Sequence, residues 1–252
     1  MSRIELPLIL TLLTATLVLA CDQATPTQPS SLTNPAAPPG LSTASQMPDF
    51  DPNDFANRID NPFFPLVRGT RFTYRGTEDG QPEQVVTKVS QRDKTILGVK
   101  VTTVVDRVFI AGELREETLD WYAQDEDGNV WYFGEDTKEL ENGKVVSTQG
   151  TWQAGKHGAR AGVIMLAHPR VGQSYHQEFA TGVAEDRARV LSVNATVSVP
   201  YGNFKHCLKT AETTPLEPGA KEIKLNCPRV GFVKGDDVSG GTAHIALTRI
   251  SH

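Results

Sequence analysis

The stretch Thr118–Glu135 decides the fold of this chain and reads TLDWYAQDEDGNVWYFGE. Two runs rich in aromatic residues flank the pair Asp127-Gly128, and Asp-Gly is a preferred central dipeptide of a type I′ hairpin turn. The stretch therefore predicts a β-hairpin with a two-residue loop. In that register the cross-strand pairs are Tyr122 with Phe133, Ala123 with Tyr132 and Gln124 with Trp131.

Both faces of the predicted hairpin are aromatic. Trp121, Val130 and Tyr132 share one face, and Tyr122, Trp131 and Phe133 share the other. A sheet with one face in water alternates apolar and polar side chains, so something must cover the second face. The cover is the segment Asn61–Leu66, a partner, or an apolar ligand in a cavity. In the last case the candidate ligand-binding residues are Trp121, Tyr122, Trp131, Tyr132 and Phe133.

Strand signals continue on both sides of the hairpin. The expected strands are short, rich in Val, Thr, Ile or aromatic residues, and separated by turn dipeptides such as Asp79-Gly80 and Asn142-Gly143. They span 71–75, 84–90, 94–97, 100–110, 114–124, 130–138, 144–147, 174–181, 184–193, 196–200, 203–213, 220–226, 231–235 and 242–250. Residues 52–59 favour a short helix and 161–167 a helical turn. The fold class is all-β, an antiparallel meander curled into a barrel, a half-barrel or two packed sheets.

The chain begins with an apolar run, Leu6–Ala20, that ends at Cys21. The run is too short to cross a bilayer core, which takes about 20 helical residues, but it suits a signal peptide. The string Val18-Leu19-Ala20-Cys21 resembles a bacterial lipobox, in which the cysteine is acylated, with palmitate for example, and becomes the mature N-terminus. An ordinary secretory signal and an uncleaved anchor are the alternatives.

These features divide the chain into a signal peptide (1–20), a lipidated disordered tether (21–49) and a single all-β domain (50–252). The tether is rich in Pro, Ser, Thr, Ala and Gln, and its lack of apolar periodicity leaves it unable to bury a core. We expect an extracytoplasmic protein, periplasmic for example, whose membrane partner is reached through the N-terminal lipid. The net charge of −5 offers no basic footprint for a nucleic-acid partner.

Two cysteines lie in the predicted domain, where an extracytoplasmic location would let disulfides persist. Cys207 and Cys227 are equally far from Glu217 along the sequence. A hairpin formed by 204–213 and 220–226 would set them opposite each other. We predict a disulfide between them, with two buried free thiols as the alternative.

Candidate metal-binding or acid–base residues are few. The best constellation is His168, His176 and Glu178, because His176 and Glu178 share one face of a predicted strand. The segment Glu113–Glu141 contains eleven carboxylates, which could hold calcium outside an EF-hand but also suit a solvated acidic edge. We assign no catalytic residue, and we expect no cofactor.

Several strings resemble an uncharacterised family of exported bacterial proteins. They are DNPFFPL at 60–66, DWYAQD at 120–125, GNVWYFGE at 128–135, GVAED at 182–186 and VPYG at 199–202. The resemblance covers most of residues 50–235 and implies export, without an established activity. The predicted lipobox, tether and meander also look like the half-barrel lipoprotein carriers of the LolA/LolB type, in architecture alone.

Three functions fit these observations. The first is a membrane-anchored, non-catalytic lipoprotein that binds an apolar small molecule or a lipid in a β cavity. The second is a structural or interaction protein of the cell envelope without a ligand. The third is a metal-dependent hydrolase using His168, His176 and Glu178. A cavity large enough for an acyl chain would separate the first from the second.

Overall fold

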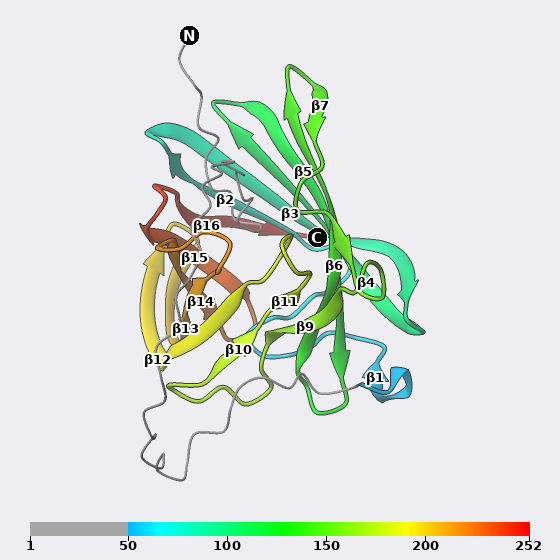
Figure 1. The fold of residues 1–252 in the computed structure, drawn as a ribbon. Coiled ribbons are helices and arrows are strands. Elements are labelled where there is room, and N and C mark those ends of the chain that lie inside the picture. Colours follow the sequence, from blue (N-terminus) through cyan, green and yellow to red (C-terminus); the bar gives the residue numbers. More distant parts are fainter. Residues whose placement is uncertain (1–49) are drawn as a thin grey trace, which may run out of the picture.

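The computed structural model describes residues 50–252 (Figure 1). The predicted signal peptide, Cys21 and the predicted tether lie outside the described residues. In chain order the elements are the 3-10 helix η1 (Pro52–Asp54) and the strands β1 (Phe55–Ala56), β2 (Arg71–Glu78), β3 (Gln81–Ile96), β4 (Val99–Ile110), β5 (Glu113–Asp125), β6 (Val130–Glu141), β7 (Lys144–Ser147), β8 (Trp152–Gln153), β9 (Arg160–Met165), β10 (Ser174–His176), β11 (Glu178–Phe179), β12 (Arg187–Val199), β13 (Gly202–Thr213), β14 (Lys221–Cys227), β15 (Gly231–Ser239) and β16 (His244–Ser251).

The strands form one antiparallel sheet that curls into a nearly closed barrel, which confirms the all-β meander. One meander runs from β12 to β16 and the other from β2 to β6. They join where β16 pairs with β2, from Ser251 opposite Arg71 to His244 opposite Thr77. Within residues 50–252 no helix is long and apolar enough to cross a bilayer.

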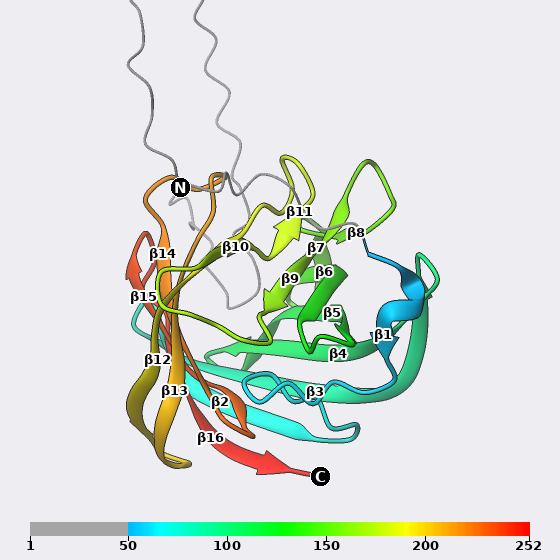
Figure 2. The same ribbon diagram turned by 90° about the horizontal axis from the view of Figure 1, so that it is seen from below.

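The short segment Ser174–Phe179 bridges the two edges of the sheet. Its first half, β10, pairs with β12, and its second half, β11, pairs with β9. Gln177 lies between the two halves and donates its backbone N–H to Asp186 O at 2.8 Å. Gly162 on β9 permits this close approach, since a Cβ there would lie 2.1 Å from Gln177 O. Figure 2 shows β9, β10 and β11 across the interior from β2 and β3.

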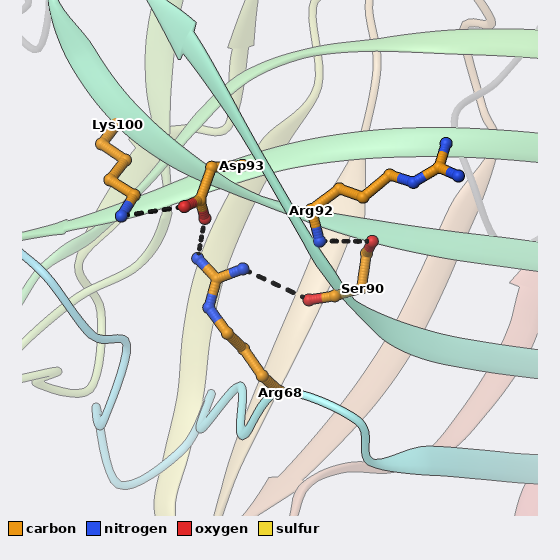
Figure 3. Close-up of polar contacts among 5 residues, drawn as sticks. All are labelled: Arg68, Ser90, Arg92, Asp93 and Lys100. Atoms are coloured by element: carbon orange, nitrogen blue, oxygen red, sulfur yellow. Dashed lines mark hydrogen bonds and ion pairs between the residues drawn. The ribbon is translucent and has the colours of Figure 1, made fainter.

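Strand β3 is one long strand, not the two strands predicted at 84–90 and 94–97. A bulge between Val89 and Asp93 replaces the predicted break, and bulges bend a strand without ending it. Figure 3 shows the contacts that hold this bend: Arg92 N–H donates to Ser90 Oγ at 3.0 Å, Arg68 contacts Ser90 O and the Asp93 carboxylate, and Lys100 Nζ lies 2.8 Å from Asp93 Oδ2.

The central hairpin forms between β5 and β6, but its predicted register is wrong by one residue. Tyr122 pairs with Tyr132, Ala123 with Trp131 and Gln124 with Val130. The loop is a turn over Asp125–Gly128, in which Gly128 N–H donates to Asp125 O and Gly128 has a φ of +92°.

The side chain of Asp125 explains the longer loop. It accepts hydrogen bonds from Asn129 N–H at 2.7 Å, from Asn129 Nδ2 at 2.9 Å and from Trp131 Nε1 at 2.8 Å. Such local side-chain bonds compete with the regular strand ladder. A shift of one residue changes which side chains share a face, so Tyr122 and Tyr132 lie on the same side of the sheet.

Both helical predictions need correction as well. Residues 161–167, predicted as a helical turn, belong largely to strand β9, where Gly162 and Val163 pair with β6. The helix predicted at 52–59 is limited to η1, after which the chain turns extended and β1 pairs with β5. In both segments, backbone pairing with a neighbouring strand, β6 for the first and β5 for the second, outweighs the weak local preference for a helix.

The core has two apolar clusters. One surrounds the central hairpin and the other lies between β2–β4 and β13–β16. The second cluster contains Cys207 and Cys227, which are fully buried and joined by a disulfide, with their Cα atoms 4.2 Å apart. Leu208 pairs with Asn226, so the cysteines face each other across β13 and β14 as the sequence predicts.

Candidate ligand cavity

A cavity of about 150 Å³ lies inside the barrel. Its apolar wall consists of side chains from β2, β4, β5, β6, β9, β15 and the segment that precedes β2. The aromatic members of this wall are Phe64, Phe72, Tyr74, Tyr122, Tyr132 and Phe232. The volume is below the roughly 300–1,000 Å³ of common ligand pockets, and it matches the roughly 150 Å³ apolar cavity that accepts benzene. The cavity is therefore sized for a small molecule and not for an acyl chain.

Tyr122 and Tyr132 form the aromatic wall contributed by the hairpin. Their rings stack with centroids 4.7 Å apart, and Phe64 meets the Tyr122 ring edge-on at 5.1 Å. Both tyrosines are buried, and the Tyr132 hydroxyl donates to Asp120 Oδ1 at 2.5 Å. The neighbouring Glu135 Oε2 lies 3.2 Å from the same hydroxyl. The two rings are thus fixed in position at the wall of the cavity.

A second part of the wall is charged. It contains the carboxyl groups of Asp106, Glu178, Asp186 and Glu212 and the ammonium group of Lys224. Lys224 Nζ lies 2.7 Å from Glu212 Oε2 and 3.3 Å from Oε2 of Glu222, its neighbour on β14. The one ammonium group of the described wall is therefore already engaged by two carboxylates.

Three oxygen atoms of the wall have no hydrogen-bond partner in the protein. They are Asp106 Oδ1, Gln177 Oε1 and Glu178 Oε2. The side chains of Gln177 and Glu178 belong to the segment that bridges the sheet edges, and these residues are 3% and 2% exposed. A buried oxygen without a partner costs about 1–3 kcal/mol. Gln177 and Glu178 thus place two unpaired buried oxygens in the cavity wall at a cost to stability.

Burial dominates the electrostatics of these acids. It raises the pKa of Glu178 well above its usual value, and the charges of Asp186 and Glu135 raise it further. Burial also raises the pKa of Asp106 to about 6 and that of Asp186 to about 6. Near neutral pH the aspartates are mainly ionised, and the raised pKa of Glu178 shifts this group toward its protonated form.

Lys224 responds in the opposite sense. Burial alone would lower the pKa of its ammonium group, but the charges of Glu212 and Glu222 outweigh burial and the pKa rises. The lysine therefore stays charged at physiological pH. Its single charge is shared between the two glutamates, so no unpaired positive charge remains for a further anion.

The segment Asn61–Leu66 closes one end of the cavity. Asn61 is 2% exposed, and its Nδ2 donates to Gly128 O at 2.8 Å and to Leu166 O at 3.1 Å. Pro62 O accepts from Arg229 N–H at 2.7 Å, which ties the segment to the β14–β15 turn. Phe64, Pro65 and Leu66 then face the cavity. The predicted internal cover exists, and it caps the barrel without filling it.

The structure separates the five aromatic residues proposed as a ligand site. Tyr122 and Tyr132 line the cavity, whereas Trp131 and Phe133 lie on the other face of the hairpin. Phe50 and Phe55 cover that face, with ring centroids 5.5 to 6.1 Å from those of Trp131 and Phe133. Trp121 also lies on the outer face, where Lys94 Nζ sits 3.0 Å from its ring centroid.

The residues of the predicted metal or acid–base trio have different environments. His168 is exposed in the loop after β9, His176 is half-buried and stacks on Phe179 at 4.5 Å, and Glu178 faces the cavity. In the part of the chain that the structure describes, no three His, Cys, Asp or Glu side chains are grouped to hold a metal ion.

The predicted acidic edge needs correction. Asp120, Glu135 and Glu116 are 0%, 1% and 3% exposed, while Glu126 and Glu141 are exposed. Burial raises the pKa of Asp120 and of Glu135, the charge of Asp106 raises that of Asp120 further, and the charge of Asp120 raises that of Glu135 further. Acids of the hairpin thus point inward behind the two tyrosines. Charge alone predicted exposure, since acids are rarely fully buried.

Sequence reasoning did not single out Asp106, Gln177 or Lys224. Asp106 shares its strand face with Val104 and Val108, and this apolar period of two was the available signal, because inward side chains recur at every second position. Lys224 shares its face with Glu222 and Asn226, which gave no such signal. Gln177 had no such signal, because it marks the point where one short segment changes strand partner.

Comparisons with known proteins give little further information. No protein-family model matches the chain, and no curated protein matches it. A crystal structure of a candidate lipoprotein from Parabacteroides distasonis ATCC 8503 aligns with a TM-score of 0.43 and 12% identity, over 76% of this chain and 99% of that chain. At this level of similarity no property of that protein transfers to this chain.

Proposed function

We propose that this protein is a lipid-anchored, extracytoplasmic binding protein whose barrel cavity holds a small molecule with an apolar body. The observation that carries the proposal is the cavity itself, with the fixed rings of Tyr122 and Tyr132 on one wall and unpaired buried oxygens on another. Ligand sites are concave, mostly apolar and provided with a few polar groups that set orientation. The volume argues against a lipid acyl chain as the ligand.

The alternative is a structural or interaction protein of the envelope without a ligand. It explains the small volume of the cavity but not the unpaired oxygens in the cavity wall. A filled core would gain from apolar side chains at the positions of Gln177 and Glu178. Leaving their oxygens unpaired costs about 1–3 kcal/mol each. A ligand that donates hydrogen bonds there offsets this cost, and that difference favours the binding protein.

Native mass spectrometry of protein purified from its own host tests the cavity. Val104 lines the cavity and is 3% exposed, so Val104→Phe should occupy the space and lower the fraction of ligand-bound protein. Val105→Phe is the matched control, because this neighbour lies on the outer face of the same strand. The same bound mass on wild type and both variants would contradict the proposal, as would no bound mass on any of them.

The lipid anchor has its own test. Cys21→Ser should abolish incorporation of labelled palmitate, and it should either release the protein from the membrane fraction or leave it as an uncleaved precursor. A control that keeps Cys21 and carries Cys207→Ser and Cys227→Ser should be labelled like the wild type. Equal labelling of the Cys21→Ser variant would refute the anchor while leaving the cavity untouched.

A further inference from the structure

We propose that the ligand of this cavity is a small organic cation, an amine or quaternary ammonium compound with a compact apolar body. The inference rests on the proposed function and narrows its ligand to one charge class. Three independent features of the wall support it: the unpaired acceptors, the aromatic faces and the engaged lysine.

The unpaired polar atoms of the wall are all acceptors. Gln177 Oε1, Glu178 Oε2 and Asp106 Oδ1 are buried without a partner in the protein. Gln177 is neutral, so its orphaned carbonyl is independent of the acidic side chains. A ligand with N–H or O–H donors would satisfy these oxygens, and a positive charge would be attracted to them. A hydrocarbon would leave them unpaired at about 1–3 kcal/mol each.

The aromatic wall attracts the same class of ligand. A cation over the face of a tyrosine or phenylalanine ring is stabilised by the ring quadrupole, most strongly where water is excluded. Tyr122, Tyr132 and Phe64 supply such rings beside the acidic wall. Their positions are fixed by stacking and by the bond from Tyr132 to Asp120. Rings held in place pay little further entropy on binding.

The charges of the cavity wall disfavour an anionic ligand. The described cavity wall carries four carboxyl groups, those of Asp106, Glu178, Asp186 and Glu212, against the single ammonium group of Lys224. That ammonium already contacts Glu212 and Glu222. An anionic ligand would therefore enter a site of its own sign without a free positive partner.

Three probes of the same shape separate charge from size. Choline carries a positive charge, 3,3-dimethylbutan-1-ol is its neutral carbon isostere, and 3,3-dimethylbutanoate is an anion of similar bulk. Titration calorimetry with the full-length chain should show choline binding at least about tenfold more tightly than the alcohol, as expected for cation–π and charge-assisted contacts. The anion should not bind.

The outcomes distinguish this inference from the proposed function. Equal or tighter binding of the alcohol overturns the cation and leaves a small-molecule cavity standing. Preferential binding of the anion overturns the cation and points to Lys224. If none of the three probes binds, the cation inference is overturned. The proposed function is overturned as well only if native mass spectrometry finds no host ligand on the wild-type protein.

Glu178→Gln tests the acidic contact with almost no change in shape. It should weaken choline binding about tenfold and leave binding of the alcohol unchanged. Glu117→Gln is the control, because Glu117 bonds Arg107 Nε at 2.7 Å on the outer face of β5. An unchanged preference for choline over the alcohol in Glu178→Gln would refute the role of this carboxylate.

A pH series keeps the inference testable if that variant does not fold. Asp186, Glu135, Lys224 and Asp120 all act on Glu178. A bound cation stabilises its ionised form, so choline binding should release protons and tighten as pH rises from 5.5 to 8.5. Binding of the alcohol should not. A choline affinity independent of pH, with no proton release in buffers of different ionisation enthalpy, would contradict the model of a carboxylate-bound cation.

Discussion

Removing the Cys207–Cys227 disulfide should lower thermal stability by an amount that follows from the structure. The bond joins residues 20 apart in sequence. Freeing a loop of this length returns chain entropy to the unfolded state worth about 3 kcal/mol at 25 °C. For a domain of this size each kcal/mol moves Tm by about 2–4 °C, so reduction should lower Tm by about 6–12 °C.

Calorimetry of oxidised and fully reduced wild type measures this cross-link contribution with the core sulfur atoms kept in place. The double variant Cys207→Ala, Cys227→Ala provides the control, because its Tm should not respond to reductant. Both cysteines are fully buried, so complete reduction must be verified from the mass after alkylation of the unfolded protein. A verified reduction that shifts Tm by less than about 2 °C would refute the loop-entropy reasoning.

Three further changes have defined outcomes. Burial, and then the charges of neighbouring acids, raise the pKa of Glu78 to about 9, and burial and then Asp237 raise the pKa of Glu83 to about 7. Both groups bind protons more tightly in the folded state, so the free energy of unfolding should fall as pH rises from about 4.5 to 9. Urea titrations should show a smaller fall for Glu78→Gln than for the wild type. Gly162→Ala would press a Cβ onto the Gln177 backbone, and hydrogen exchange should become faster in 174–179, whereas unchanged exchange would count against the close packing. Asp125→Ala removes three hydrogen bonds from the hairpin loop and should cost about 2–3 kcal/mol by denaturant titration; a loss below about 0.5 kcal/mol would show that the loop does not depend on this side chain.

Local patterns in the sequence predict the strands and hairpins of this fold well, because turn dipeptides and period-two apolar residues are short-range signals. Asn142-Gly143 separates β6 from β7, and both residues have a positive φ. The cysteine pair is a second local signal, since equal spacing about a turn places both residues opposite each other. The pairing of β16 with β2 joins the two ends of the described chain, and no local pattern encodes it.

The cavity was harder to predict because its acids contradict the usual relation between charge and exposure. Asp120 and Glu135 sit in a stretch that reads as a solvated acidic surface, yet they are almost fully buried. Burial raises the pKa of both carboxyl groups, and a protonated carboxyl is far cheaper to bury than an ionised one. Sequence alone does not report a pKa, so it could not place these groups.

Gly134 shows how one residue helps to fix the aromatic part of the cavity wall. Residues three apart on a regular strand point to opposite faces, so Tyr132 and Glu135 should diverge. In the structure, the pairs Asp120–Glu135 and Tyr122–Tyr132 are separated by one residue on β5, Trp121, but by two residues on β6, Phe133 and Gly134.

The extra residue turns Glu135 back to the side of Tyr132, where their side chains meet at 3.2 Å. Gly134 has a φ of +124°, and a Cβ would lie 2.3 Å from Trp152 O, so this bulge depends on glycine. A strand without the bulge would direct the carboxyl group of Glu135 to the outer face. The tyrosine hydroxyl would then keep Asp120 alone as its acceptor, and the fixed ring that the proposed ligand site uses would lose one of its two supports.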